Sequence, residues 1–238
     1  MKNIIFISDL HISEDQPNLT HLFLQFLDSD FTDVEALYIL GDLFAFWVGD
    51  DGCFNDCQKI KAAMKKLSIP VYLMPGNRDF MMGKSFAAEC GATLFSDPHV
   101  IDLYGVPTLL SHGDILCAND YFQRIFRYCT KGALVRNLFL KFSLKFRMRL
   151  VNFIRKFSVY NNQRKSVQLM DVNQKTTCSM MQRYNAKLII HGHTHKPGIS
   201  RVKGNDNLTR ISLPNWTEKK GEALKYYADG TYKFVEIR

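Results

Sequence analysis

Five short apolar runs recur along the chain, and each ends at side chains able to bind a cation or a phosphate. The runs lie at residues 4–8, 36–40, 71–74, 108–111 and 188–191. The clusters that follow them are, in order, Asp9-Leu10-His11, Gly41-Asp42, Gly76-Asn77-Arg78-Asp79, His112-Gly113-Asp114 and Gly192-His193-Thr194-His195. Short apolar runs with such boundaries are typical of buried strands. If the strands share one sheet, their polar ends meet at the edge where α/β sheets bind ligands.

Between these strands the hydrophobic period becomes helical. Leu19, Leu22, Phe23 and Phe26 follow the i, i+3, i+4, i+7 spacing and predict a helix over 18–28. We expect further helices at 54–67, 80–89 and 173–185. Further strands are expected at 93–95, 99–103, 107–111, 209–213, 224–227 and 232–237, with turns at Gly105-Val106-Pro107 and Asp229-Gly230. This alternation predicts a layered α/β fold with a mixed sheet.

Residues 120–170 interrupt the alternation with a stretch that contains no proline and many Phe, Leu, Lys and Arg residues. Its large apolar residues recur at steps of three and four and should share one helical face. They are Val135, Phe139, Phe142, Phe146, Leu150, Phe153 and Phe157, flanked by Lys141, Lys145 and Arg149. We therefore expect one domain over 1–238, with 120–170 as a helical lid or cap inserted between strands.

The charge of this insertion is one-sided. Residues 121–170 hold twelve Lys or Arg and no Asp or Glu, whereas the whole chain has a net charge of +8. The other residues therefore carry a net charge of −4, so the basicity needs a local explanation. Three interpretations fit: a cap whose stripe is only its core, a lid that meets acyl chains and an anionic membrane surface, and a nucleic-acid surface. The alternation of cations with large aliphatic residues favours lipid over nucleic acid.

Composition narrows the class of protein. The chain of 238 residues is 46% apolar and has no apolar run near the roughly 18 residues that span a bilayer. The apolar part of the N-terminus is too short for a signal peptide, so we expect a cytoplasmic protein. The six cysteines form no C-x-x-C pair, and we expect buried thiols rather than a zinc site.

The polar clusters suit a pair of divalent cations. Mixed carboxylate, imidazole and amide donors favour Mn, Fe or Zn over an all-oxygen Ca or Mg site. Two cations about 3.5–4 Å apart need a bridging ligand, and Asp42 is the candidate because a carboxylate has two oxygens. His191 precedes the last ligand pair and could orient a ligand instead. The predicted ligands are Asp9, His11, Asp42, Asn77, His112, His193 and His195.

With these motifs the chain resembles the calcineurin-like metallophosphoesterase superfamily from residue 9 to residue 195. Most of its members have His after the motif Asn, whereas this chain has Arg78. That variant resembles the UDP-2,3-diacylglucosamine hydrolases of lipid A synthesis. Further stretches similar to that family are Trp47-Val48-Gly49-Asp50-Asp51, His112-Gly113-Asp114-Ile115-Leu116-Cys117, Met170-Asp171-Val172-Asn173-Gln174 and His191-Gly192-His193-Thr194-His195-Lys196-Pro197.

The resemblance implies a metallophosphoesterase fold, with a central mixed β-sandwich flanked by helices and a helical cap. It implies two Mn²⁺ per chain, one on Asp9, His11 and His195, the other on Asn77, His112 and His193, with Asp42 bridging. Water activated by the two metals would attack the α-phosphorus of UDP-2,3-diacylglucosamine, giving UMP and 2,3-diacylglucosamine 1-phosphate. The implied catalytic residues are Asp42, Asn77, Arg78 and His112, and the implied substrate contacts are Asn77, Arg78, Asp120, Ser158, Asn162, Lys165 and His193.

Arg78 suits a stabilising role, since a guanidinium forks onto phosphate oxygens but is a poor proton donor. Two stretches depart from the family pattern: Ala118-Asn119-Asp120 follows Cys117, and Pro214-Asn215-Trp216 replaces a Gly-Asp-Trp sequence. Both bear on recognition of the sugar and the acyl chains. The alternatives are a nucleotide or nucleic-acid phosphodiesterase, and a non-catalytic membrane-docking module that the intact ligand set disfavours. We expect a monomer that binds no nucleic acid and associates peripherally with the cytoplasmic face of the inner membrane.

Overall fold

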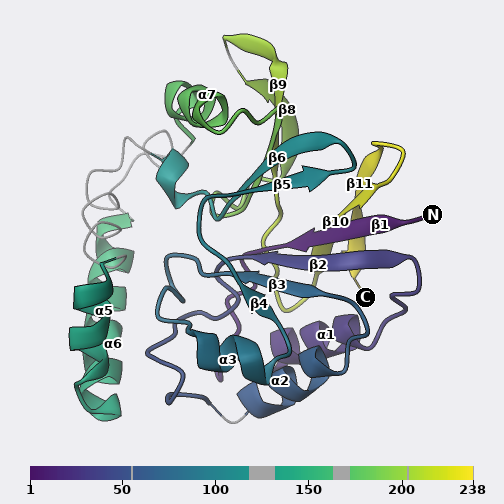
Figure 1. The fold of residues 1–238 in the computed structure, drawn as a ribbon. Coiled ribbons are helices and arrows are strands. Elements are labelled where there is room, and N and C mark those ends of the chain that lie inside the picture. Colours follow the sequence, from purple (N-terminus) through teal and green to yellow (C-terminus); the bar gives the residue numbers. More distant parts are fainter. Residues whose placement is uncertain (55, 118–131, 163–171, 203, 238) are drawn as a thin grey trace.

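Two mixed β-sheets packed face to face form the centre of the protein (Figure 1). The structure, a computed structural model, describes all residues except 55, 118–131, 163–171, 203 and 238. One sheet has six strands in the order β11-β10-β1-β2-β3-β4. Strands β1 to β4 are parallel to one another, and β10 pairs antiparallel with β1 and β11. The strands are β1 (Asn3–Ile7), β2 (Val34–Leu40), β3 (Val71–Met74), β4 (Thr93–Leu94), β10 (Gly221–Tyr227) and β11 (Tyr232–Ile237).

The second sheet has five strands in the order β5-β6-β7-β9-β8. Its centre is parallel, since β6, β7 and β9 run the same way, and its two edge strands are antiparallel. The strands are β5 (His99–Leu103), β6 (Val106–Ser111), β7 (Leu188–His191), β8 (Gly198–Val202) and β9 (Asn205–Ser212). Parallel strands from both sheets therefore end at the same side of the sandwich.

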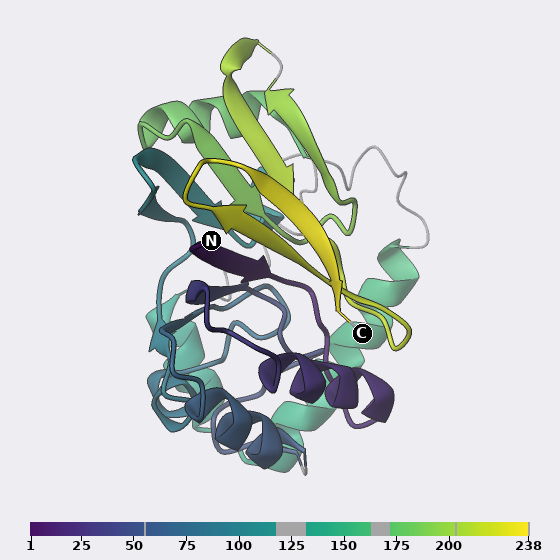
Figure 2. The same ribbon diagram turned by 90° about the vertical axis from the view of Figure 1, so that its right-hand side faces the viewer.

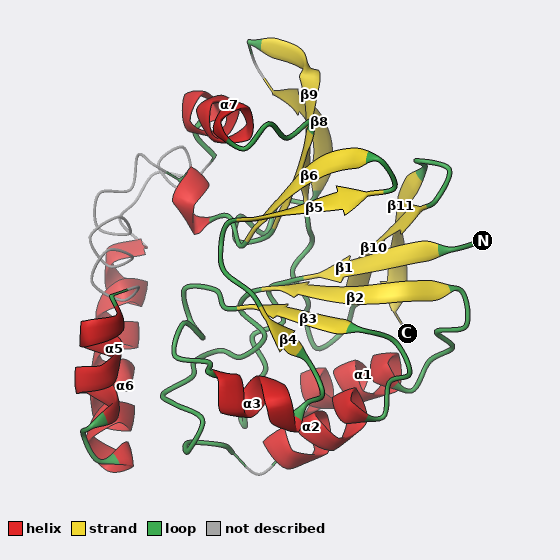
Figure 3. Ribbon diagram, in the orientation of Figure 1, coloured by secondary structure: helices red, strands yellow, loops and turns green. Residues whose placement is uncertain are grey.

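Helices cover both outer faces of the sandwich (Figures 2 and 3). Below the six-stranded sheet lie α1 (Pro17–Leu27), α2 (Cys57–Lys65) and α3 (Lys84–Glu89), and α7 (Gln174–Arg183) covers the five-stranded sheet. A short 3₁₀ turn, η1 (Asp114–Leu116), follows β6. Two further helices, α5 (Ala133–Leu140) and α6 (Leu144–Asn162), follow each other after a short turn and lie at one edge of this body. We call this pair the cap hairpin.

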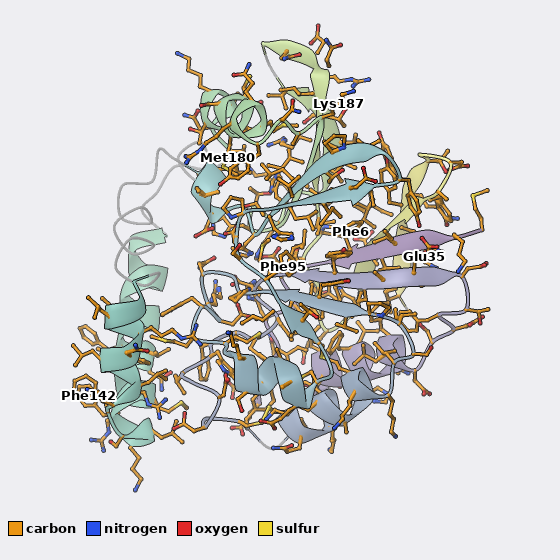
Figure 4. All side chains as sticks on the ribbon, in the orientation of Figure 1. Phe6, Glu35, Phe95, Phe142, Met180 and Lys187 are labelled. Carbon is orange, nitrogen blue, oxygen red and sulfur yellow. A yellow bond between two sulfur atoms is a disulfide. The ribbon has the colours of Figure 1, made fainter. Side chains whose placement is uncertain are left out.

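The strand sequences explain the layering. Side chains alternate between faces, so Phe6 enters the core between the sheets whereas Ile5 and Ile7 pack on the helical side. Leu40 and Ile190 also belong to the core between the sheets. Phe6 is labelled within the sandwich in Figure 4. Strands β1, β2, β3 and β7 are covered on both faces, and their buried positions are mostly apolar, as the sequence pattern required.

The predicted α/β class with mixed sheets and flanking helices is confirmed. The motif strands do not share one sheet, however, because β1, β2 and β3 belong to one sheet and β6 and β7 to the other. The helix expected at 80–89 begins only at Lys84. Strand β8 was not predicted, because Gly198–Val202 is largely exposed at an edge and shows weak alternation.

The apolar stripe of the insertion was predicted on one helical face, and this is wrong. The chain turns between Leu140 and Leu144, so the stripe is divided between two helices. Phe139 packs against the core below the six-stranded sheet, while Phe142 and Phe146 contact each other and stay exposed. Phe142 projects from the cap hairpin on the side away from the sandwich (Figure 4). The apolar residues of the insertion thus contribute to two surfaces, one packed against the core and one exposed.

The expectation of free buried thiols is wrong at one pair. Cys53 and Cys57 form a disulfide with a Cα–Cα separation of 5.8 Å. The four-residue spacing at the start of α2 brings the two Cβ atoms within the range that a disulfide spans. Cys90 and Cys117 are buried thiols, as expected.

Candidate metal centre

The polar clusters after the parallel strands meet where the carboxyl ends of the two sheets come together. Asp9 and His11 follow β1, Asp42 follows β2 and Asn77 follows β3. The other sheet contributes His112 after β6, and His193 and His195 after β7. Convergence was predicted at the edge of one sheet; the site instead spans the gap between two.

Five of these residues have left-handed backbone conformations. Asp9, His11, Asp42, His193 and His195 have φ between 53° and 69°. Such values are uncommon for residues with a Cβ and concentrate at functional sites. Gly41 also has a positive φ of 89°, and a Cβ there would lie 2.5 Å from Nδ1 of the His112 ring.

One group of donors comprises Asp9, His11 and His195. The Nε2 atoms of the two histidines are 3.2 Å apart, and Asp9 Oδ1 lies 3.4 Å from His195 Nε2. Asp9 Oδ1 and His11 Nδ1 are buried without a hydrogen-bond partner in the described structure. Buried polar atoms are normally satisfied, so this arrangement fits a cation that would complete it. Asp9 Oδ2 is already held by the Ser8 hydroxyl at 2.6 Å and the His193 N–H at 2.8 Å.

A second group comprises Asp9, Asp42 and His112. His112 Nδ1 lies 3.0 Å from the Leu40 carbonyl oxygen, to which it can only donate. The other ring nitrogen, His112 Nε2, lies 2.8 Å from Asn77 Oδ1. In a neutral ring protonated at Nδ1, Nε2 is an acceptor like Asn77 Oδ1, so this contact fits either a second proton on the ring or a cation bound by both atoms. Asp42 lies between the groups, with Oδ1 3.7 Å from His112 Nε2 and Oδ2 3.8 Å from His11 Nδ1.

Burial and neighbouring charges tune these groups. Burial lowers the pKa of His11 to about 3 and that of His193 to about 4, so both imidazoles are neutral at neutral pH. Burial also opposes charging of His112, but Asp42 and Asp9 raise its pKa to about 9. Burial raises the pKa of Asp42 to about 7. His11 and His193 therefore offer neutral imidazoles, the form that binds a divalent transition metal, whereas a cation would have to displace protons from His112 and Asp42.

Asp79 braces the turns that carry Asp42 and Asn77. Its Oδ1 accepts the N–H of Gly76 at 2.6 Å and that of Asp42 at 3.3 Å. Its Oδ2 accepts the N–H of Leu43 at 2.8 Å and that of Phe44 at 3.4 Å. Burial raises the pKa of Asp79, and these N–H groups oppose the rise.

The C-terminal Pro-Asn-Trp stretch contacts the turn that carries Asp9. The Trp216 N–H donates to the Asp9 carbonyl at 3.1 Å, and the indole packs against Phe23 and Phe26. The indole N–H donates to the Glu222 carbonyl at 2.9 Å. The departure from the family pattern thus leaves a buried tryptophan behind the turn that carries Asp9.

Arg78 lies at the rim, with Nε 3.7 Å from Asp42 Oδ2 and its backbone N–H donating to Asp42 Oδ1 at 2.9 Å. Its side chain is 43% exposed, so the guanidinium can reach an incoming phosphate. His191 is buried and its Nδ1 contacts the Gly192 carbonyl oxygen at 2.8 Å, which fits a structural role beside the ligand pair.

The described structure therefore brings together the predicted metal residues and Arg78. Four predicted substrate contacts are not placed: Asp120 and Lys165 lie outside the described residues, and the side chains of Ser158 and Asn162 on α6 are not described. Sequence reasoning assigned no role to Asp79 or Trp216. Asp79 ends the quoted Gly-Asn-Arg-Asp motif, and an acidic residue after a turn at the end of a strand was the available signal.

Comparison with known proteins shows what the chain is similar to. The profile of a family described as calcineurin-like phosphoesterase matches residues 2–197. A Haemophilus influenzae (strain PittGG) protein named UDP-2,3-diacylglucosamine hydrolase is 41% identical, over 99% of this chain and 100% of that protein. A Neisseria meningitidis serogroup B protein with the same name is 42% identical, over 97% and 96% of the respective chains. A solved archaeal phosphodiesterase has the same fold, with a TM-score of 0.50, 11% identity, and coverage of 98% of this chain and 99% of that one.

Proposed function

We propose that this chain, which belongs to the calcineurin-like phosphoesterase family, hydrolyses the pyrophosphate bond of UDP-2,3-diacylglucosamine in lipid A biosynthesis. The products are UMP and 2,3-diacylglucosamine 1-phosphate, with water attacking the α-phosphorus. The observation that carries the proposal is the meeting of the predicted ligands with Arg78 at one end of the sandwich. Relatives at about 40% identity over nearly the whole chain bear the name of this activity. They do not favour the alternative of a simple nucleotide or nucleic-acid phosphodiesterase.

The proposed ligands fall into two groups, one for each cation. Asp9, His11 and His195 would hold one divalent cation, Asn77, His112 and His193 the other, and Asp42 would contribute to both. When bound, such a pair offsets phosphate charge and lowers the pKa of bound water. We propose Mn²⁺ as the metal, in two ions per chain, because the donors mix imidazole, carboxylate and amide groups.

Arg78 supplies the chain's own positive charge at the reacting phosphate. Its guanidinium can donate two parallel hydrogen bonds to phosphate oxygens, which stabilises negative charge that builds during attack. Its Nε is 3.7 Å from Asp42, so the charge lies beside the proposed bridging ligand. Asp120, Ser158, Asn162 and Lys165 are proposed to contact the sugar, the acyl chains or the phosphates.

We propose that residues 120–170 act as a lid that also meets an anionic membrane surface. Lys141, Lys145 and Arg149 are exposed on the cap hairpin, as are Phe142 and Phe146. Basic residues near an anionic leaflet contribute about 1 kcal/mol each, and the aromatic rings can enter the interface. In the part of the chain that the structure describes, no helix is long and apolar enough to span a bilayer. We propose that the protein acts as a monomer at the cytoplasmic face of the inner membrane.

The deciding experiment is turnover of UDP-2,3-diacylglucosamine with mass spectrometry of the products. Release of UMP together with the 1-phosphate lipid supports the proposal. Hydrolysis of simple nucleotide diesters with none of the lipid would overturn it. Replacing Lys141, Lys145 and Arg149 together by Gln should weaken binding to anionic vesicles, most clearly at low salt. Unchanged vesicle sedimentation would remove the membrane part.

A further inference from the structure

The cap hairpin is joined to the body through a buried arginine. Arg147 lies in the first turn of α6, and its side chain is only 3% exposed. Its Nε donates to the Phe142 carbonyl at 3.0 Å and its Nη1 to the Val48 carbonyl at 2.6 Å. Both oxygens of Asp51 accept from the guanidinium, one of them at 2.9 Å from Nη1. A buried charge persists only when it is paired, so this is an organised contact rather than a solvated basic face.

The loop that receives Arg147 is shaped for it. Gly49 has φ of 132°, a conformation that side chains rarely adopt, and a Cβ there would collide with Nη1 of Arg147. The same Cβ would lie 2.8 Å from Cδ2 of Leu140, so it would also strike α5. The hydrogen bond from Arg147 holds the pKa of Asp51 below its usual range. Residues 48–51 thus form a docking site for the cap hairpin within the same chain, which we call the receptor.

This receptor is connected to the metal centre. It follows Asp42 in the loop after β2, and the Trp47 N–H donates to the Arg78 carbonyl at 3.1 Å. Asp50 accepts the Trp47 indole N–H at 3.0 Å and the Gly83 N–H at 2.9 Å, which ties this loop to the one after β3.

A second arginine fixes the other helix of the cap hairpin to the same pair of loops. Arg136 on α5 donates to the Met82 carbonyl at 3.2 Å. Two of the twelve cations of the insertion therefore face the body of the protein and not a membrane.

We propose that Arg147, seated in the Val48–Asp51 receptor, is a positioning residue that sets the cap hairpin against the metal centre and thereby determines preference for a lipid-bearing substrate over a small phosphodiester. The inference rests on the proposed function. The exposed apolar side chains of the cap can bind acyl chains productively only when they stand at a fixed distance from the reacting phosphate. Arg147 supplies that distance through three acceptor atoms on the loop that follows Asp42, the Val48 carbonyl oxygen and the two carboxylate oxygens of Asp51.

The test compares two substrates in neutral detergent micelles. Arg147→Met keeps the length of the side chain and removes its donors. We expect KM for UDP-2,3-diacylglucosamine to rise about tenfold or more, with bound metal and turnover of bis(p-nitrophenyl) phosphate within about twofold of the parent chain. Gly49→Ala should reproduce the defect with Arg147 intact, since it blocks the seat. Arg183→Met, at an exposed arginine of α7, removes the same charge elsewhere and should leave both activities unchanged.

Outcomes separate the two proposals. A parent chain that hydrolyses the diester but not the lipid refutes the proposed function. A parent chain active on the lipid, with Arg147→Met and Gly49→Ala equally active, refutes the positioning role. Equal losses on both substrates together with lost metal would also refute it, since Arg147 would then only stabilise the fold. Partial recovery in Arg147→Lys would support it, because lysine restores a charge but not the fork.

Discussion

Replacing Asp79 by Asn tests whether one carboxylate organises the turns that carry the proposed ligands Asp42 and Asn77. Asp79 accepts four backbone N–H groups, two on each oxygen. An amide keeps one oxygen and turns its NH₂ group toward the other two donors. The variant therefore loses one short charge-assisted bond and one long one, and leaves buried N–H groups unsatisfied.

The magnitude follows from these contacts. A hydrogen bond to a charged group contributes about 1.5–3 kcal/mol, and an unsatisfied buried donor costs about 1–3 kcal/mol. Relief of the buried charge offsets part of this, so we expect a net loss of about 2–4 kcal/mol. For a chain of this size that lowers Tm by about 4–16 °C.

The assay is thermal unfolding of the metal-free and metal-loaded forms, with metal content measured alongside. We expect lower Tm in both forms and weaker metal binding, because the turns of Asp42 and Asn77 lose their shared brace. Asp229→Asn is the matched control, since exposed Asp229 accepts only from Thr231 among the described residues, and the amide oxygen can still do so. If Asp79→Asn matches the parent in Tm and in metal content, the bracing role is wrong.

Three further predictions concern the centre itself. Asp42→Ala should lose measurable turnover and at least part of the bound metal without unfolding, and a variant that retains both would refute the bridging role. Arg78→His should lower kcat/KM on the UDP-lipid by about 10- to 100-fold, because the forked charge is lost; unchanged kinetics would exclude a specific role. Metal affinity should rise with pH between about 6 and 9, because bound cations displace protons from Asp42, whose pKa is about 7, and His112, whose pKa is about 9. Calorimetry in two buffers of different ionisation enthalpy measures that proton release. Metal binding without any proton release would contradict the assignment of Asp42 and His112 as ligands.

Much of the fold and of the centre was predictable from local signals. Apolar runs ending in Asp, Asn and His mark the strands and their ligand-bearing ends, since both depend on neighbouring residues. The division of the strands between two sheets was not predictable, because pairing partners such as β6 and β7 lie far apart in the sequence. Strand β8 was missed because an exposed edge strand needs little hydrophobic pattern.

The cap hairpin is the part of the structure that was least predictable from the sequence. A run of basic residues gives no sign that Arg147 is buried while Arg149 is exposed. The difference arises from Val48 and Asp51, which lie almost a hundred positions earlier. The disulfide of Cys53 and Cys57 was likewise missed, because spacing alone does not say which way two thiols point.

The proposed ligands are divided between two sheets, so a bound metal would be coupled to folding. Asp9 and Asp42 belong to one sheet, His112 and His193 to the other, so the complete donor set exists only after the sheets have docked. A cation that binds only this state shifts the unfolding equilibrium by mass action, by about 2.7 kcal/mol when its concentration is a hundred times Kd. On this assignment metal saturation would report completed sheet–sheet assembly, and a fragment that ends before His112 should gain no thermal stability from the ion.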